Sequence, residues 1–142
     1  TLHRFETERA KHPNKLYMST EYLPNAALEN WDATEKHPWF LGGFCWTAMD
    51  YIGEAGIGKS KLVPESPQLP KGLMGMGLFY RNNWPVFNAY CGDLDLIGDR
   101  KAESYYKNVV WRNSPVEVLV HRPIPEGQKE VIATWGMPDE IK

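Results

Sequence analysis

The chain has 142 residues and a formal net charge of −2, and 42% of its residues are hydrophobic while 24% are charged. This composition is typical of a globular chain that can bury a core, and it argues against disorder. The charge balance lacks the basic face that nucleic acid or an anionic membrane requires, and no apolar run approaches the ~20 residues of a membrane helix. We therefore expect neither nucleic acid nor a membrane as a partner.

The cysteines and the aromatic residues both bear on chemistry. Cys45 and Cys91 have neither CxxC spacing nor a histidine at metal-ligand distance, so no zinc site is predicted and both are interpreted as small core residues. Aromatic residues make up 13% of the chain. Their rings suit the apolar faces of sugars, but the same rings can fill a core.

The N-terminal part of the chain predicts a helix and then a strand. Leu2–Lys11 contains helix formers, and the helix should end at His12–Asn14, because Pro13 removes a donor and restricts the residue before it. Lys15–Glu21 should follow as a strand with alternating faces. Its apolar face would hold Leu16, Met18 and Thr20.

A second helix and strand follow. Asn25–Lys36 shows helical spacing of apolar residues and ends before Pro38. The expected apolar face consists of Ala27, Leu28, Trp31 and Ala33. Trp39–Tyr51 is almost wholly apolar, as in a strand that is buried on both faces of a parallel sheet. The helix–strand alternation predicts an α/β fold with a parallel sheet wrapped by helices.

The middle of the chain is rich in glycine and proline. Gly53–Asn88 is interpreted as one long irregular connection, and loops of this length are usually functional. Asp99–Trp111 should then form a helix capped by Asp99 and broken at Asn113–Pro115. Its expected apolar face consists of Ala102, Tyr105, Tyr106 and Val109.

Beyond that break the pattern changes to short alternating strands. Val116–His121 and Glu130–Trp135 are the predicted strands, and the turn-rich Pro123–Gly127 joins them. We therefore place a domain boundary near Asn113, which divides the chain into residues 1–112 and 113–142. The second part is too short for an independent β-sandwich of ~100 residues.

Gly53–Ser60 reads GEAGIGKS and matches the phosphate-binding pattern GxxxxGK[ST]. That site needs a helix starting at the Lys-Ser pair, whose free N–H groups complete the phosphate cradle. Pro64 follows too soon for such a helix, so we interpret the segment as a flexible glycine-rich loop. The second glycine-rich stretch, Gly72–Gly77, has the wrong spacing for a dinucleotide loop and is interpreted as structural.

Three clusters, Ser19–Tyr22, Leu41–Tyr51 and Cys91–Arg100, together resemble family 2 glycoside hydrolases, particularly β-galactosidases. In that family the nucleophile is a Glu at the C-terminal end of barrel strand seven, and Glu21 is the matching position. The resemblance implies that the chain holds the C-terminal βα units of a (β/α)8 TIM barrel. The first strands of an immunoglobulin-like β-sandwich would follow.

The resemblance also implies two substrate-binding residues. Trp46 matches a Trp of barrel strand eight that walls the sugar pocket, although a plain core role is open for it. Asp93 lies where β-galactosidases often place an Asn that contacts the sugar or a nearby cation. The Asp departs from that pattern, so a helix cap or a solvated loop acid is an equal alternative for Asp93 and Asp95.

The implied reaction is the retaining hydrolysis of terminal β-galactosides, which needs a second carboxyl group as acid/base. The family places that group on strand four, before the first residue here, so we expect the chain alone to be inactive. No cofactor is required, and a Mg²⁺ or Na⁺ ion in the full-length enzyme is left open. The expected partners are the β-galactoside and the remainder of the parent polypeptide, with a homo-oligomer left open.

Two other functions are open on sequence grounds. One is a related specificity, β-glucuronidase or β-mannosidase, because the residues that select the sugar lie mainly outside this chain. The other is a non-catalytic sugar-binding module that uses Trp46 and Trp84. The hydrolase interpretation makes a geometric prediction: Glu21 and Trp46 should face one cavity from neighbouring parallel strands, with Cα atoms within roughly 12 Å.

Overall fold

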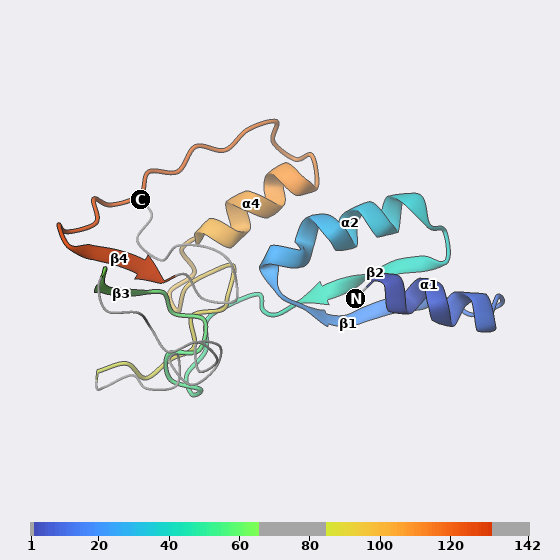
Figure 1. The fold of residues 1–142 in the computed structure, drawn as a ribbon, viewed down its shortest axis with the longest axis horizontal. Coiled ribbons are helices and arrows are strands. Elements are labelled where there is room, and N and C mark those ends of the chain that lie inside the picture. Colours follow the sequence, from blue (N-terminus) through green and yellow to red (C-terminus); the bar gives the residue numbers. More distant parts are fainter. Residues whose placement is uncertain (1, 66–84, 132–142) are drawn as a thin grey trace.

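A computed structural model describes residues 2–65 and 85–131 of the chain, which form a mixed α/β fold. The elements in chain order are α1 (Leu2–Lys11), β1 (Tyr17–Tyr22), the 3-10 helix η1 (Pro24–Ala26), α2 (Ala27–Lys36), β2 (Phe40–Cys45), β3 (Lys61–Pro64), α4 (Ala102–Val110) and β4 (Gln128–Val131) (Figure 1). Gly72–Gly77 and Trp84 lie outside the described residues. Within the described ranges no helix has the length and apolarity needed to cross a membrane.

β1 and β2 form a parallel two-stranded sheet, as the sequence predicts. The paired residues are Tyr17 with Phe40, Ser19 with Gly43, and Tyr22 with Cys45. η1 and α2 connect the two strands, so the predicted helix over Asn25–Lys36 is confirmed with a 3-10 start. The sheet therefore brings the C-terminal ends of both strands to the same edge.

The buried face of this sheet differs from the prediction. Ser19 is the buried residue of β1, at 4% exposure. A Cβ atom added at Gly43 would lie 2.6 Å from the Cβ of Ser19, so the two strands meet where only small residues fit. Four apolar side chains of this region are exposed instead: Leu16, Met18, Leu41 and Phe44. The expectation that the second strand is buried on both faces is thus wrong for the described residues.

α1 is held against the sheet by aromatic contacts. The Phe5 ring lies 6.1 Å from the Tyr17 ring and 5.1 Å from the Phe40 ring. The Arg9 guanidinium lies over the Trp39 ring at 5.8 Å. Such contacts each contribute about 0.5–1.5 kcal/mol, and they fix α1 beside β1 and β2.

α2 packs against β2 and α4 through small side chains. Its buried residues are Ala27, Asn30 and Ala33, whereas Leu28 is 51% exposed. The Asn30 amide can be buried because its Nδ2 donates to the Ala26 carbonyl at 2.9 Å. The buried face of α2 is therefore rotated relative to the predicted apolar face, because small residues rather than large apolar ones let α2 approach the sheet.

β2 ends at Cys45, whereas the predicted strand continues to Tyr51. Beyond it the backbone pairs with a distant segment: the Thr47 N–H donates to the Cys91 carbonyl at 3.0 Å, and the Asp93 N–H donates to the Thr47 carbonyl at 3.0 Å. A hydrophobic run cannot reveal such a change of partner. The consequence is that residues 91–94 lie directly beside the end of β2.

A second sheet pairs β3 with β4 in antiparallel register, from Lys61 with Val131 to Pro64 with Gln128. Figure 1 shows it apart from the β1–β2 sheet. The interpretation of Gly53–Asn88 as wholly irregular is therefore wrong.

The glycine-rich motif leads into this second sheet. Lys59 is followed by strand β3 and not by a helix, so the prediction that GEAGIGKS lacks the phosphate-binding architecture is confirmed. Gly56 and Gly58 have φ values of +82° and +80°, which glycine adopts readily. The Gly56 N–H donates to the Asn88 carbonyl at 2.8 Å and the Lys59 N–H to the Gly56 carbonyl at 3.2 Å. The first bond joins the loop to a distant segment and the second closes a turn, so neither donor is available to a phosphate.

The predicted hairpin near the C-terminus is not formed as expected. Residues 116–120 are not in a strand, and Val116, Val118 and Val120 are exposed at 65%, 81% and 66%. β4 begins at Gln128, two residues before the predicted strand, and its partner is β3. Residues 132–135 of the predicted strand lie outside the described part of the chain.

α4 begins later than predicted, and its N-cap is Lys101 rather than Asp99. The Asp95 carboxylate explains this, because its Oδ1 accepts the N–H groups of Ile97 and Asp99 at 2.9 Å each and thereby forms a turn before the helix. The buried residues of α4 are Ala102, Glu103, Lys107 and Val110. The helix therefore buries two charged side chains where an aromatic face was predicted.

Gly92 allows a close backbone approach, and Gly92→Ala is expected to destabilise the fold. The added Cβ would lie 2.2 Å from the Asp50 nitrogen and 2.3 Å from the Met49 carbonyl carbon, and backbone atoms cannot rotate away. We expect a loss near the upper end of the overpacking range, about 3 kcal/mol. The control is Gly98→Ala, which meets nothing within 4 Å and has only its φ of +94° to strain, about 1–2 kcal/mol. Thermal unfolding measures both, and equal losses would contradict this account.

Candidate active site

Glu21 is the penultimate residue of β1 and its side chain is exposed. The Ser19 hydroxyl donates to the Glu21 carbonyl oxygen at 3.2 Å, which braces the backbone at this point. Ligands of parallel sheets bind at the carboxyl ends of the strands. Glu21 therefore presents an accessible carboxylate at the edge of the sheet where chemistry is expected.

Two hollows meet at Glu21. The first has a volume of about 280 Å³ and is lined by Phe5, Glu21, Tyr22, Leu23, Asn25, Ala26, Glu29 and Asn30. The second has a volume of about 370 Å³ and is lined by Arg4, Phe5, Glu8, Tyr17, Met18, Ser19, Thr20 and Glu21. Both combine aromatic and carboxylate side chains, as a sugar site requires.

Each hollow contains one further carboxylate, Glu29 in the first and Glu8 in the second. The Glu8 carboxylate forms an ion pair with Lys11 at 2.8 Å, and the Lys11 hydrogen bond holds the pKa of Glu8 below its usual value. A general acid needs the opposite shift. Glu8 is thus unsuited to protonate a leaving group.

Trp46 follows the last residue of β2, and its N–H donates to the Tyr22 carbonyl at 2.8 Å. Because neighbouring Cα atoms are about 3.8 Å apart, this bond places the Cα atoms of Glu21 and Trp46 within the predicted ~12 Å. Trp46 is 37% exposed, and its ring meets the Tyr51 ring edge-on, with centroids 6.1 Å apart. Trp46 is absent from the described linings of both hollows at Glu21. The shared cavity therefore stays a prediction.

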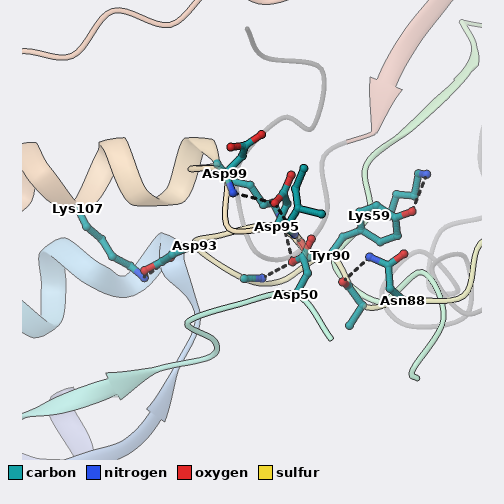
Figure 2. A network of polar contacts seen from close by, with 12 residues as sticks. Asp50, Lys59, Asn88, Tyr90, Asp93, Asp95, Asp99 and Lys107 are labelled. Carbon is teal, nitrogen blue, oxygen red and sulfur yellow. Dashed lines mark hydrogen bonds and ion pairs between the residues drawn. The ribbon is translucent and has the colours of Figure 1, made fainter. Parts of the chain in front are cut away.

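Asp93 does not present a free carboxylate. Its Oδ1 and Oδ2 lie 2.5 Å and 2.7 Å from the Nζ of Lys107 (Figure 2). An ammonium thus occupies the position that a cation would take, so Asp93 does not fit a Mg²⁺ or Na⁺ site. Among the described residues, no group of three or more His, Cys, Asp or Glu side chains could hold a metal. The predicted contact of Asp93 with a sugar stays a prediction, and in this structure its carboxylate forms an internal ion pair.

Lys107 is the residue that sequence reasoning missed. It is 1% exposed, and burial disfavours its charge, but hydrogen bonds with Asp93 and Cys45 outweigh burial and raise the pKa of Lys107. Burial also raises the pKa values of the neighbouring Cys45 thiol and Tyr22 phenol. A lysine in an amphipathic helix ordinarily faces solvent, so no pattern in the sequence indicates this pairing.

Comparisons with known proteins show which proteins this chain resembles. No family model matches the chain. A protein of Formosa agariphila named "Putative beta-glucuronidase" is 30% identical over 122 residues, which cover 82% of this chain and 10% of that protein. The solved structure of a glycosyl hydrolase family 2 (GH2) member from Bacteroides cellulosilyticus is 28% identical, with a TM-score of 0.65 over 99% of this chain and 17% of its own. The chain belongs to glycoside hydrolase family 2.

A further family 2 structure, from Bacteroides cellulosilyticus DSM 14838, is 24% identical with a TM-score of 0.54, and it supports the fold alone. It is matched over 99% of this chain and 14% of its own. The chain thus spans about a tenth of the curated relative and less than a fifth of either solved chain. The family assignment made from the three sequence clusters is confirmed.

Proposed function

We propose that the chain is part of a retaining glycoside hydrolase in which Glu21 is the nucleophile. One observation supports this most: within a family 2 chain, an exposed carboxylate ends a parallel strand and borders two hollows. The backbone hydrogen bond between Tyr22 and Trp46 keeps the Trp46 backbone near that strand end, and the Phe5 and Tyr22 rings line the first hollow together with Glu21. A carboxylate beside an aromatic wall is the arrangement that glycosyl transfer to an enzyme uses.

The proposed reaction has two displacements at the anomeric carbon. A Glu21 carboxylate oxygen attacks that carbon while its bond to the leaving oxygen breaks, and an acid residue protonates the leaving oxygen. Water then attacks the same carbon, gives its proton to the former acid and releases Glu21. The acid/base residue belongs, in this proposal, to a part of the parent polypeptide that precedes this chain.

The barrel assignment belongs to the same proposal. β1 and β2 would be strands seven and eight of a TIM barrel, and α2 would be the helix between them. Their parallel register and the exposed apolar residues Leu41 and Phe44 support this, since a complete barrel would cover them. The boundary near Asn113 and a following immunoglobulin-like sandwich remain predictions.

We further propose a neutral β-galactoside as substrate, although the curated relative is named a β-glucuronidase. A glucuronide carries a carboxylate that needs an available cation. The segment beside Trp46 instead carries Asp93 and Asp95. Two lysines beside this segment are already engaged, because Lys107 pairs with Asp93 and the Nζ of Lys101 pairs with Asp50 at 2.9 Å, while Arg4 lines the second hollow at Glu21.

Activity of the full-length parent polypeptide on a panel of nitrophenyl glycosides tests this proposal. We expect the β-galactoside to give the largest kcat/KM, ahead of the β-glucuronide and the β-mannoside, because the charged segment disfavours an anionic sugar. A preference for the glucuronide would contradict the charge argument. Turnover of none of the three would contradict the hydrolase proposal itself.

A further inference from the structure

Lys107 is a fully buried lysine whose ammonium forms an ion pair with Asp93. Both Asp93 carboxylate oxygens accept from its Nζ at 2.5 Å and 2.7 Å, and the lysine is 1% exposed. Figure 2 shows the Lys107 side chain extending from α4 to the loop that carries Asp93. A buried charge persists only when it is paired in this way. The geometry of this pair therefore fixes where the loop lies relative to α4.

The Asp93 backbone transmits this constraint to the end of β2. Its N–H donates to the Thr47 carbonyl at 3.0 Å, and the Thr47 N–H donates to the Cys91 carbonyl at 3.0 Å. These two bonds join the loop to the residue that directly follows Trp46. The position of Trp46 thus depends on a loop that Lys107 holds in place.

Lys107 also lies beside the ends of both parallel strands. It interacts with the Cys45 thiol, and its charge acts on the Tyr22 phenol. Cys45 and Tyr22 are register partners, Cys45 directly precedes Trp46, and Tyr22 directly follows Glu21. The ammonium therefore acts on one residue that is adjacent in sequence to each of the two side chains that the proposed reaction uses.

We propose that Lys107 is a positioning residue that sets the location of the Trp46 ring relative to the Glu21 carboxylate. This inference rests on the proposed function. Lys107 does not touch the sugar in this account, and it acts through Asp93, Thr47 and the strand ends. A misplacement of about 1 Å can cost about 100-fold in rate, so loss of the pair should reduce turnover without removing the nucleophile.

The test separates positioning from simple stabilisation by using four variants of the full-length polypeptide. Lys107→Met removes the ammonium and leaves the Asp93 carboxylate unpaired. Lys107→Met combined with Asp93→Asn removes both charges, and neutral replacement of a buried pair often preserves stability. Lys107→Arg keeps a charged donor. Arg112→Met is the matched control, because it breaks the exposed ion pair that the Arg112 guanidinium, just beyond the end of α4, makes with Glu35 of α2 at 2.7 Å.

We expect the melting temperature of the double variant to lie within a few degrees of that of the wild type. Its kcat on the preferred nitrophenyl glycoside should be about 10- to 100-fold lower, whereas its KM should change by less than about threefold. Lys107→Arg should keep kcat within about threefold, and Arg112→Met should match the wild type. Wild-type kcat in the double variant would overturn the proposal.

The remaining outcomes are also decisive. If the double variant is not recovered in folded form, Lys107→Arg decides: retained kcat supports positioning by the charged donor, and a tenfold loss of kcat at the wild-type melting temperature overturns it. A loss in Arg112→Met equal to that in the double variant would also overturn the proposal, because breaking an exposed ion pair beside the end of α4 would then have the same effect. A wild type that hydrolyses no glycoside would overturn the proposed function, and this inference with it.

Discussion

Glu21→Gln in the full-length polypeptide should lower kcat by several orders of magnitude. The amide has the size of the carboxylate but cannot attack the anomeric carbon, so no glycosyl-enzyme forms and both displacements are lost. Because Glu21 is exposed at the end of β1, the substitution should leave the fold intact. Steady-state kinetics on the preferred nitrophenyl glycoside, with thermal unfolding as the check on folding, measures the effect.

Glu29→Gln is the matched control for this prediction. Glu29 lines the same 280 Å³ hollow as Glu21 and is also exposed, but it lies on α2 and not at a strand end. We expect its kcat to stay within a few-fold of the wild type. A collapse of activity in Glu29→Gln with activity retained in Glu21→Gln would reverse the assignment of the nucleophile.

The isolated chain of 142 residues should hydrolyse none of these glycosides. A retaining enzyme needs a second carboxyl group about 5–5.5 Å from the nucleophile. Of the carboxylates that share a hollow with Glu21, Glu8 is committed to Lys11 and has a lowered pKa, which is the wrong direction for an acid. Loss of general acid catalysis alone removes about 100- to 10,000-fold in rate.

The comparison is made between equal concentrations of the isolated chain and the full-length polypeptide. Circular dichroism must show helix in the isolated chain, so that inactivity is not caused by unfolding. Turnover by the folded chain at a rate near that of the full-length polypeptide would show that the acid/base residue lies within these residues. Glu29 would then be the first residue to examine, because it borders the same hollow as Glu21.

The local elements of the fold could be predicted from the sequence because their signals are local. The helix over Leu2–Lys11 ends before Pro13, and α2 ends before Pro38, as proline chemistry requires. The alternation of helix and strand predicts the parallel pairing of β1 and β2, which the register confirms. The absence of a helix after Lys59 followed from the position of Pro64.

Pairings between distant segments could not be predicted, because they leave no periodic pattern. β3 lies within a glycine-rich stretch and finds its partner β4 much later in the chain. The end of β2 is set by hydrogen bonds from Thr47 to the loop at Cys91, which the apolar run through Met49 conceals. The buried faces were misjudged where small residues such as Ser19 allow close approach.

The candidate site was predicted to a similar extent. The strand-end position of Glu21 follows from the sequence, and the backbone proximity of Trp46 is confirmed. The resemblance to β-galactosidases places Asp93 where an Asn contacts the sugar or a nearby cation. In the structure the Asp93 carboxylate pairs with Lys107. Lys107 lies on α4, and no short-range sequence pattern connects this helix to the loop that carries Asp93.

Covalent labelling of the full-length polypeptide tests the role of Glu21 most directly. A 2-fluoro-glycoside of the preferred sugar slows both displacements, so the glycosyl-enzyme accumulates on the nucleophile. Peptide mass spectrometry should then find the fluorosugar on the peptide that contains Glu21, and no label should form in Glu21→Gln. Label on any other carboxylate, or undiminished labelling of Glu21→Gln, would contradict the proposal that Glu21 is the nucleophile.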